Sequence, residues 1–461
     1  MILRPYQADS VSSIRASYAS GHRAPLFVLP TGGGKTFIFT YTSQKAVERG
    51  NRVCILVHRQ ELLNQASRSL REMGVAHGLI SPRYPRNNEP VQIASVQTLI
   101  RRLKRHPEQF DLIVVDEAHH AVAGTWRKII DLMPNAKILG VTATPIRTDG
   151  QGLSEIFDDL IVGASMASLI DMGYLVKPVV YAPPTAVDLS GVRKRGGDFD
   201  AKQLTERMDK PTITGSAVEH YKKLCPYKPA IAFCASVEHA KHVAEQFKAA
   251  GFRARSIDGT MTDAERRNAI EDLGNGGLHI LTSCDIVSEG TDIPVVEAAI
   301  LLRPTQSTGL YIQQVGRALR TAPRKTKAII LDHVGNVLRH GMPDEMRDWT
   351  LDGIAKPAAA NDNESSIAVK QCEKCFACFK PSPVCPQCGH VHAVKEHKLE
   401  EIEGELKEVD PAEIEAMRRK QRQEIGKART LEDLQKIAKE RGYSKGWAYH
   451  IHKARSQRKY A

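Results

Sequence analysis

A glycine-rich segment near the N-terminus has the residue types that bind phosphate. Residues 29–36 follow an apolar run and read LPTGGGKT. Glycines let backbone N–H groups turn toward phosphate oxygens, and a following helix adds a favourable dipole. Lys35 can reach the outer phosphates of a nucleoside triphosphate, and the Thr36 hydroxyl can bind Mg²⁺. Leu29 replaces the glycine of the general phosphate-loop pattern, so this is a variant of it. The predicted nucleotide contacts here are Thr31, Gly32, Gly33, Gly34, Lys35 and Thr36.

Two adjacent carboxylates could complete a site for hydrolysis. Asp116 and Glu117 directly follow the apolar run 112–115. A carboxylate at the C-terminal end of a strand lies where α/β folds bind ligands. We expect Asp116 to hold Mg²⁺ and Glu117 to accept the proton of an attacking water. A DE pair alone means little, but this one follows the phosphate loop on a neighbouring predicted strand.

A third candidate element lies far along the chain, at residues 313–320, which read QQVGRALR. On a helix, Arg317 and Arg320 are three residues apart and share a face. Such a pair can neutralise the charge that develops on a transferred phosphoryl group. Surface ion pairing is the alternative, but the neighbouring Gln313 and Gly316 favour the nucleotide site.

Short apolar runs separated by longer mixed segments indicate the elements that position these residues. Buried parallel strands have this continuous apolar character, and their alternation with helices predicts doubly wound parallel sheets. The chain is too long for one core, so two tandem α/β domains are expected. The predicted strands are residues 26–29, 53–57, 112–115, 138–141, 230–233, 280–282, 298–301 and 328–331.

Composition suggests the boundaries between domains and appendages. The basic loop at 193–198 could contact nucleic acid or be a solvated connector. The last 35 residues carry ten Lys or Arg against three Asp or Glu. The aromatic residues in this tail could stack on bases or form the core of a small helical pair; they are Tyr443, Trp447 and Tyr449. The predicted segments are an ATP-binding domain (1–165), a connector (166–210), a second domain (211–352), a linker (353–370), a knuckle (371–393), an acidic helical segment (394–426) and a basic tail (427–461).

Five of the nine cysteines cluster at residues 372–388. Two CxxC pairs nine residues apart suit a structural, tetrahedral zinc site. The predicted zinc ligands are Cys372, Cys375, Cys385 and Cys388. Free thiols or an iron–sulfur cluster are alternatives, Cys378 could replace a neighbouring ligand, and His390 and His392 are weaker candidates. The knuckle could bind the substrate or dock a protein.

Bulk properties limit the function classes. The net charge of +12 suits a polyanionic partner, although many enzymes are mildly basic. No apolar run approaches the roughly 18–20 residues that cross a bilayer, so no membrane partner is expected. The N-terminus lacks the pattern of a secretory signal, and we expect a cytoplasmic protein.

The order and spacing of these elements resemble those of the superfamily 2 DEAD/DEAH-box helicases over residues 3–332. The resemblance implies two RecA-like domains that bind ATP and Mg²⁺. It implies that Gln7 (in LRPYQ) contacts adenine and that Gly290 and Asp292 face the nucleotide. Thr142 and Thr144 would couple hydrolysis to movement between the domains.

The same resemblance implies a nucleic-acid path across both domains. Its predicted contacts are Arg59, Gln60, Ser95, Gln97, Thr98 and Ser236. The LRPYQ start and the SEGTDIP segment resemble the DNA-repair and phage recombination helicases, so DNA is the expected partner. An RNA helicase and a non-catalytic nucleic-acid-binding protein with a vestigial ATP site are the alternatives. A protein partner could bind the knuckle or the tail.

Overall fold

The computed structural model describes most of the chain up to the cysteine knuckle and a few segments beyond it. Contacts divide the chain into two compact units, Met1–Ala393 and Val394–Ala461. No helix among the described residues is both long and apolar enough to cross a membrane. The described residues are 3–82, 84–105, 108–121, 124–147, 151–183, 192–195, 198–208, 211–284, 293–352, 369–392, 419, 424–425, 428, 430–440 and 448.

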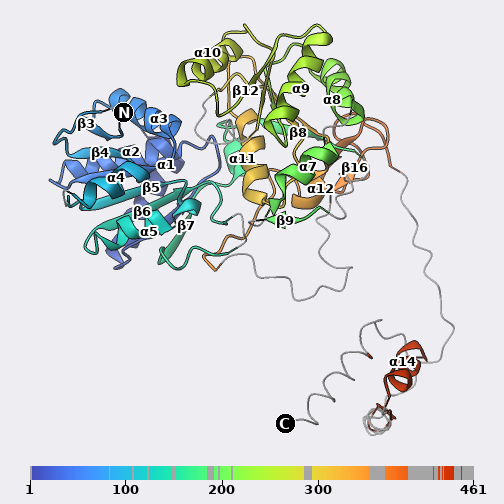
Figure 1. Cartoon of the computed structure of the whole chain (residues 1–461), viewed down its shortest axis with the longest axis horizontal. Coiled ribbons are helices and arrows are strands. Elements are labelled where there is room, and N and C mark those ends of the chain that lie inside the picture. Colours follow the sequence, from blue (N-terminus) through green and yellow to red (C-terminus); the bar gives the residue numbers. More distant parts are fainter. Residues whose placement is uncertain are drawn as a thin grey trace. The chain divides into compact units, whose positions relative to one another are not determined.

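The first lobe is built on a seven-stranded sheet with the order β3-β4-β2-β5-β6-β1-β7 (Figure 1). Every pairing in this sheet is parallel. All carboxyl ends of its strands therefore meet at one edge. The strands are β1 (Pro25–Val28), β2 (Val53–Val57), β3 (His77–Ile80), β4 (Val91–Ser95), β5 (Leu112–Asp116), β6 (Lys137–Thr142) and β7 (Asp159–Val162).

Both faces of this sheet are buried, which explains the continuous apolar runs. Leu26 and Val28 belong to one core cluster, whereas Phe27 and Leu29 belong to another. Successive side chains of a strand point to opposite faces, so each face must be apolar where helices cover it. The helical elements are α1 (Pro5–Ala19), α2 (Lys35–Val47), α3 (Gln60–Glu72), α4 (Val96–Leu103), η1 (Ala118–His120) and α5 (Gly124–Asp131).

The second lobe carries an eight-stranded sheet with the order β12-β13-β11-β14-β15-β8-β17-β16. Its pairings are parallel from β12 to β8. The predicted fold class, two tandem RecA-like parallel-sheet lobes, is confirmed. The strands are β8 (Lys177–Tyr181), β11 (Ala230–Phe233), β12 (Ala254–Ile257), β13 (Ile280–Ser283), β14 (Ala298–Leu301), β15 (Lys327–Asp332), β16 (Lys370–Gln371) and β17 (Ala377–Phe379).

The interval expected as a connector, 166–210, contributes to the second lobe. It contains β8, which pairs with β15 from Lys177↔Lys327 onward. It also contains the short hairpin of β9 (Lys194–Arg195) and β10 (Asp198–Phe199), which lies in the predicted basic loop. The helices of this interval and lobe are α6 (Met166–Asp171), α7 (Ala201–Met208), α8 (Pro211–Leu224), α9 (Val237–Ala249), α10 (Asp263–Gly274), α11 (Thr308–Ala318) and α12 (Asn336–His340).

The cysteine knuckle supplies the last two strands of the second sheet. β17 pairs antiparallel with β8 and with β16. The knuckle therefore extends the sheet of the second lobe.

The C-terminal unit contains α14 (Leu431–Glu440), on which Leu434 is fully buried beside Ala428. The tail aromatics Tyr443, Trp447 and Tyr449, and the predicted acidic helical segment apart from residues 419 and 424–425, lie outside the described residues.

Candidate functional site

The phosphate loop lies between the end of β1 and the start of α2. Gly32 and Gly34 have φ values of +85° and +86°, which strongly favour glycine. Gly34 precedes α2, so Lys35 and Thr36 form its first turn. The Lys35 ammonium donates to the carbonyl oxygen of Leu29 at 3.2 Å. The geometry matches an anion site at a helix N-terminus.

Aromatic residues that were not predicted brace this loop. The Tyr6 hydroxyl donates to the carbonyl oxygen of Gly33 at 2.8 Å, and the Tyr6 ring lies 5.1 Å from that of Tyr174. The predicted adenine contact Gln7 is also adjacent, because a Cβ atom on Gly34 would lie 2.6 Å from Gln7 Nε2. Tyr6 stands beside Gln7 in the LRPYQ motif, so the sequence contained a signal for it.

The two predicted carboxylates lie at the carboxyl end of β5. Glu117 has the unusual φ value of +50°, and its side-chain oxygen Oε2 is buried without a hydrogen-bond partner in the described part of the chain. The imidazole Nδ1 of His119 lies 3.5 Å from this oxygen and 3.2 Å from Thr142 Oγ1. A strained backbone and an unsatisfied carboxylate oxygen are both typical of a reactive site.

Charges from both lobes act on Lys35. Burial lowers the pKa of the Lys35 ammonium, whereas Glu117 and Asp116 raise it. Arg317 and Arg320 of the second lobe lower the same pKa. The five predicted charged residues are therefore close enough to interact electrostatically.

Direct packing also joins the phosphate loop to α11. A Cβ atom on Gly316 would lie 2.7 Å from Thr31 Cβ, and one on Gly32 would lie 3.3 Å from Arg320 Cγ. Gln313 and Arg317 of α11 are 5% and 6% exposed, so both side chains are buried. The three sequence elements therefore meet at one site between the two lobes.

The predicted coupling residues lie between the carboxylates and α11. The Thr142 hydroxyl donates to the carbonyl oxygen of Thr144 at 2.8 Å and accepts from the Thr144 N–H at 3.2 Å. A Cβ atom on Gly309, in the first turn of α11, would lie 2.8 Å from Thr144 Oγ1. Contacts thus run from Glu117 through His119 and these threonines to α11.

The predicted nucleic-acid contacts share a structural position. Arg59, Ser95 and Ser236 each cap the N-terminus of the helix that follows a parallel strand, and Ser95 is also the last residue of its strand. Gln60 begins α3, and the Ser95 hydroxyl donates to Gln97 Oε1 at 3.2 Å. Helix N-termini are suited to phosphate groups. Thr98 lies in the first turn of α4.

Sheet order separates these residues from the nucleotide residues. In the first lobe β4 and β2 precede the nucleic-acid candidates, whereas β5, β6 and β1 precede the nucleotide candidates. The two groups thus occupy different halves of one edge. Gly290 and Asp292 lie outside the described residues.

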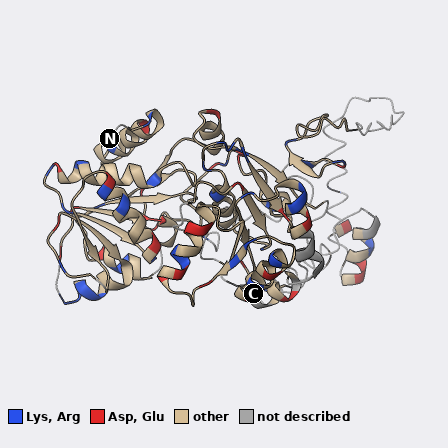
Figure 2. Cartoon of the chain, turned by 90° about the horizontal axis from the view of Figure 1, so that it is seen from above, with Lys and Arg blue, Asp and Glu red and all other residues tan. Residues whose placement is uncertain are grey.

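Basic and acidic residues are interspersed along both lobes (Figure 2). The net charge therefore does not by itself locate a nucleic-acid path. The positions of individual basic segments are better indicators of such a path than the net charge.

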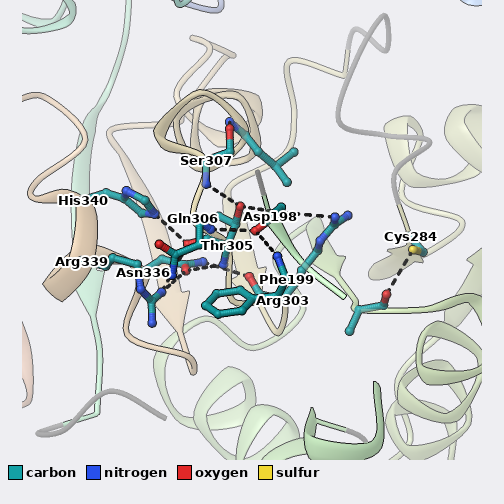
Figure 3. Close-up of polar contacts among 12 residues, drawn as sticks. Asp198, Phe199, Cys284, Arg303, Thr305, Gln306, Ser307, Asn336, Arg339 and His340 are labelled. Atoms are coloured by element: carbon teal, nitrogen blue, oxygen red, sulfur yellow. Dashed lines mark hydrogen bonds and ion pairs between the residues drawn. The ribbon is translucent and has the colours of Figure 1, made fainter. Parts of the chain in front are cut away.

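The basic hairpin is fixed to the loop before α11 through Asp198 (Figure 3). Asp198 accepts hydrogen bonds from the Thr305 hydroxyl at 2.9 Å and from the Gln306 N–H at 2.7 Å. The Arg303 guanidinium lies 3.6 Å from the same carboxylate. The Thr305 hydroxyl in turn accepts from the N–H of Ser307, which caps α11. The hairpin is therefore tied to the helix that carries Arg317.

A further contact in Figure 3 joins two loops of the second lobe. The Cys284 thiol donates to the carbonyl oxygen of Ala235 at 3.6 Å. It links the end of β13 to the end of β11, just before Ser236.

The four predicted metal ligands come together in the knuckle. All sulfur atoms of Cys372, Cys375, Cys385 and Cys388 lie within 4.8 Å of one another. The Cys372–Cys388 and Cys375–Cys385 sulfur distances are 3.6 and 3.7 Å. Zn–S bonds of about 2.3 Å in a tetrahedron place sulfurs about 3.8 Å apart, so the set fits zinc.

The two halves of the knuckle have matching backbone geometry. The N–H groups of Phe376 and Gly389 donate to the carbonyl oxygens of Cys372 and Cys385, each four residues earlier. Both residues have positive φ values, +59° and +70°. Cys378 is not one of the four clustered thiols, because it lies in β17, where it pairs with Val180.

Two protein-family models match the chain, one on each lobe. Residues 1–147 match the family described as type III restriction enzyme, res subunit, and residues 217–322 match the helicase conserved C-terminal domain. The two matches correspond to the two parallel-sheet lobes.

Individual proteins extend this similarity. A 51.5 kDa protein of a Lactococcus phage is 34% identical over 84% of this chain and 82% of its own length. The Saccharomyces cerevisiae protein named as an ATP-dependent helicase, IRC3, is 31% identical over 72% of this chain, but the matched region spans only 52% of the yeast protein. The solved fragment of an HsdR subunit of a type I restriction enzyme from Vibrio vulnificus shares the fold, with a TM-score of 0.61, 21% identity, and coverage of 77% of this chain and 68% of that one.

Proposed function

We propose that this chain, which belongs to the ATP-hydrolysing superfamily 2 helicases, uses hydrolysis to move along or unwind DNA. The observation that carries the proposal is the packing of the phosphate loop against the second lobe, where Gly316 lies against Thr31 and Arg320 lies against Gly32. There Lys35, Asp116 and Glu117 of the first lobe share one electrostatic environment with Arg317 and Arg320 of the second. A site divided between two lobes makes hydrolysis depend on lobe closure.

The residues of this site have complementary roles in this proposal. Lys35 and the N-terminus of α2 hold the phosphates, and Thr36 and Asp116 hold Mg²⁺. Glu117 accepts a proton from the water that attacks the terminal phosphorus, while the bond to the ADP oxygen breaks. Arg317 and Arg320 stabilise the charge that accumulates on the transferred group.

Binding of the adenine base and coupling of hydrolysis to lobe movement complete the cycle. Gln7 contacts the adenine, braced by its position against Gly34. Because Thr144 packs against the start of α11, a change around Glu117 reaches the second lobe directly. Nucleic acid is held by residues at the strand ends of both lobes. A change in the spacing of the lobes therefore moves the contacts of one lobe along the nucleic acid relative to those of the other.

DNA is the proposed partner for two reasons. The family model that covers the first lobe is described as a restriction-enzyme subunit, and restriction enzymes act on DNA. The LRPYQ start also resembles that of DNA-repair and phage recombination helicases.

Zinc is the proposed metal of the knuckle. The four thiols fit a closed tetrahedral site that leaves no open position for a substrate. Its role in this proposal is therefore structural.

A comparison of nucleic-acid substrates tests the function. ATP turnover by the full chain is measured without nucleic acid and with single-stranded DNA, forked DNA and RNA of matched sequence. We expect DNA to raise kcat at least tenfold and RNA to raise it less. Stronger stimulation by RNA would identify an RNA helicase. Turnover unchanged by any nucleic acid would overturn the motor function, and absent turnover with retained DNA binding would indicate a vestigial ATP site.

A further inference from the structure

The cysteine knuckle holds one edge of β8. Ala377 and Cys378 of β17 pair with Tyr181 and Val180. The Gln371 side chain also donates a hydrogen bond to the carbonyl oxygen of Ala182. Without β17, this side of β8 would be an unpaired edge in the described sheet, and edge strands fray more readily than central ones.

Side-chain packing strengthens the same junction. Tyr181 packs against a small buried cluster that is made up of Ala377, Phe379 and the ligand residues Cys372 and Cys385. This core is very small, so the knuckle needs a metal to supply its folding free energy. β17 lies between the two cysteine pairs in sequence, so one bound metal restrains both ends of it.

The opposite end of β8 leads directly to the candidate nucleotide site. Just before the strand, the Val176 N–H donates to the carbonyl oxygen of Leu319 at 2.9 Å. Leu175 forms an antiparallel bridge with Arg320. The backbone of Arg320 is therefore held by the segment that continues into β8.

Leu175 also contacts the first lobe. Its side chain is 2% exposed, and its Cδ2 atom would lie 2.9 Å from a Cβ atom on Gly32. The Cγ atom of Arg320 approaches the same point. Leu175 thus packs where the phosphate loop meets the arginine.

We propose that the metal-loaded knuckle positions Arg320 for ATP hydrolysis by holding β8, and with it Leu175 and Val176, in register. This inference rests on the proposed roles of zinc and Arg320. Among the described residues, the knuckle pairs with β8 and donates a hydrogen bond to Ala182, so it acts on the nucleotide site through β8. Loss of the metal would release β17, loosen β8 and allow the Arg320 backbone to shift. A misplacement of about 1 Å in a catalytic group can cost about 100-fold in rate.

The main experiment compares the zinc-loaded full chain with Cys388→Ser. Zinc content is measured by mass spectrometry, kcat is measured at saturating single-stranded DNA, and DNA affinity is measured separately. Hydrogen–deuterium exchange follows peptides that cover residues 175–182 and 319–322. We expect the variant to lose zinc, to exchange faster in both peptides and to lose kcat about tenfold or more, while DNA affinity changes less than twofold.

Two further variants separate docking from folding of the knuckle. Gln371→Ala keeps all four thiols but removes the hydrogen bond to Ala182. It should retain one zinc, and its increase in exchange and its loss of kcat should be smaller than those of Cys388→Ser. Glu373→Ala, at an exposed position between two ligands, should match the unaltered protein in zinc, exchange and kcat.

The outcomes distinguish this inference from the proposed function. If Arg320→Ala keeps full activity, the role proposed for the arginine fails. If Arg320→Ala is inactive but zinc-free Cys388→Ser keeps its kcat and its exchange pattern, only the inference fails. If the zinc-free variant loses DNA affinity at unchanged kcat, the knuckle is a DNA-binding arm and the inference is overturned.

Discussion

Gly316 of α11 packs directly against Thr31 of the phosphate loop, so closely that a Cβ atom on the glycine would lie 2.7 Å from Thr31 Cβ. Glycine in a helix interior costs roughly 0.5–1 kcal/mol relative to alanine. The chain thus has an unfavourable residue in α11 at the point where the two lobes meet. Close approach of the lobes is the physical reason for it.

Gly316→Ala should therefore separate stability from activity. The added methyl group favours the helix but collides with Thr31, so we expect kcat for ATP to fall about tenfold or more while the melting temperature changes little. Gly274→Ala, at the end of α10 with open space around it, is the matched control and should keep full activity. Normal turnover in Gly316→Ala would show that the lobes do not close through this contact.

Glu117→Gln should abolish turnover without abolishing ATP binding. The amide keeps the shape of the side chain but cannot accept the proton of water, so kcat should fall by about 100-fold or more. Binding of a fluorescent ATP analogue checks that the site is intact. Glu72→Gln, on an exposed turn at the end of α3, should behave as the unaltered protein. Near-normal turnover in Glu117→Gln would assign the general base to another residue.

Asp198→Ala should loosen the basic hairpin from the loop before α11. The carboxylate is 15% exposed and accepts from Thr305 and Gln306, and its loss also leaves Arg303 without this acidic neighbour. Hydrogen bonds to charged groups contribute about 1.5–3 kcal/mol each, so we expect a loss of about 2–4 kcal/mol in the free energy of unfolding. Urea denaturation measures it. Asp171→Ala, exposed at the end of α6, should change stability by less than about 0.5 kcal/mol. If Asp198→Ala also lowered the free energy of unfolding by less than about 0.5 kcal/mol, the hairpin would be held by other contacts.

Stability of the second lobe should fall as pH decreases, in part because of His340. Burial lowers the pKa of His340 from 6.5 to about 4. Between pH 4 and pH 6.5 this histidine binds more protons in the unfolded chain than in the folded chain. Its contribution to the free energy of unfolding therefore rises with pH in this range, and it is lost progressively as the pH falls below about 6.5. Asp332 acts in the opposite direction, because burial raises its pKa to about 6.

His340→Gln isolates the contribution of the histidine, since Asp332 is present in both proteins. Between pH 7 and pH 5 the unaltered protein should lose about 2 kcal/mol more than the variant. Chemical denaturation at both pH values gives the difference. Equal losses in the two proteins would mean that His340 is protonated as readily in the fold as in the unfolded chain.

Much of the fold could be predicted because its central strands are buried on both faces. All eight apolar runs identified in the sequence correspond to strands, among them β1, β5 and β15. Two of the strands that were not predicted, β7 and β12, have weaker patterns. β7 is partly exposed along its length, and β12 contains Arg255 and Ser256 between buried ends. A mixed pattern of this kind does not distinguish a short strand from a loop.

The sequence by itself determined the local chemistry: glycines before Lys35, carboxylates after an apolar run, and cysteines in two CxxC pairs. Each of these depends on residues that are neighbours along the chain. Only the tertiary structure decided that Arg320 lies against Gly32, that Asp198 ties a basic hairpin to α11, and that β17 pairs with β8. Those contacts join segments far apart in sequence, and they depend on the path of the whole chain, which no local spacing specifies.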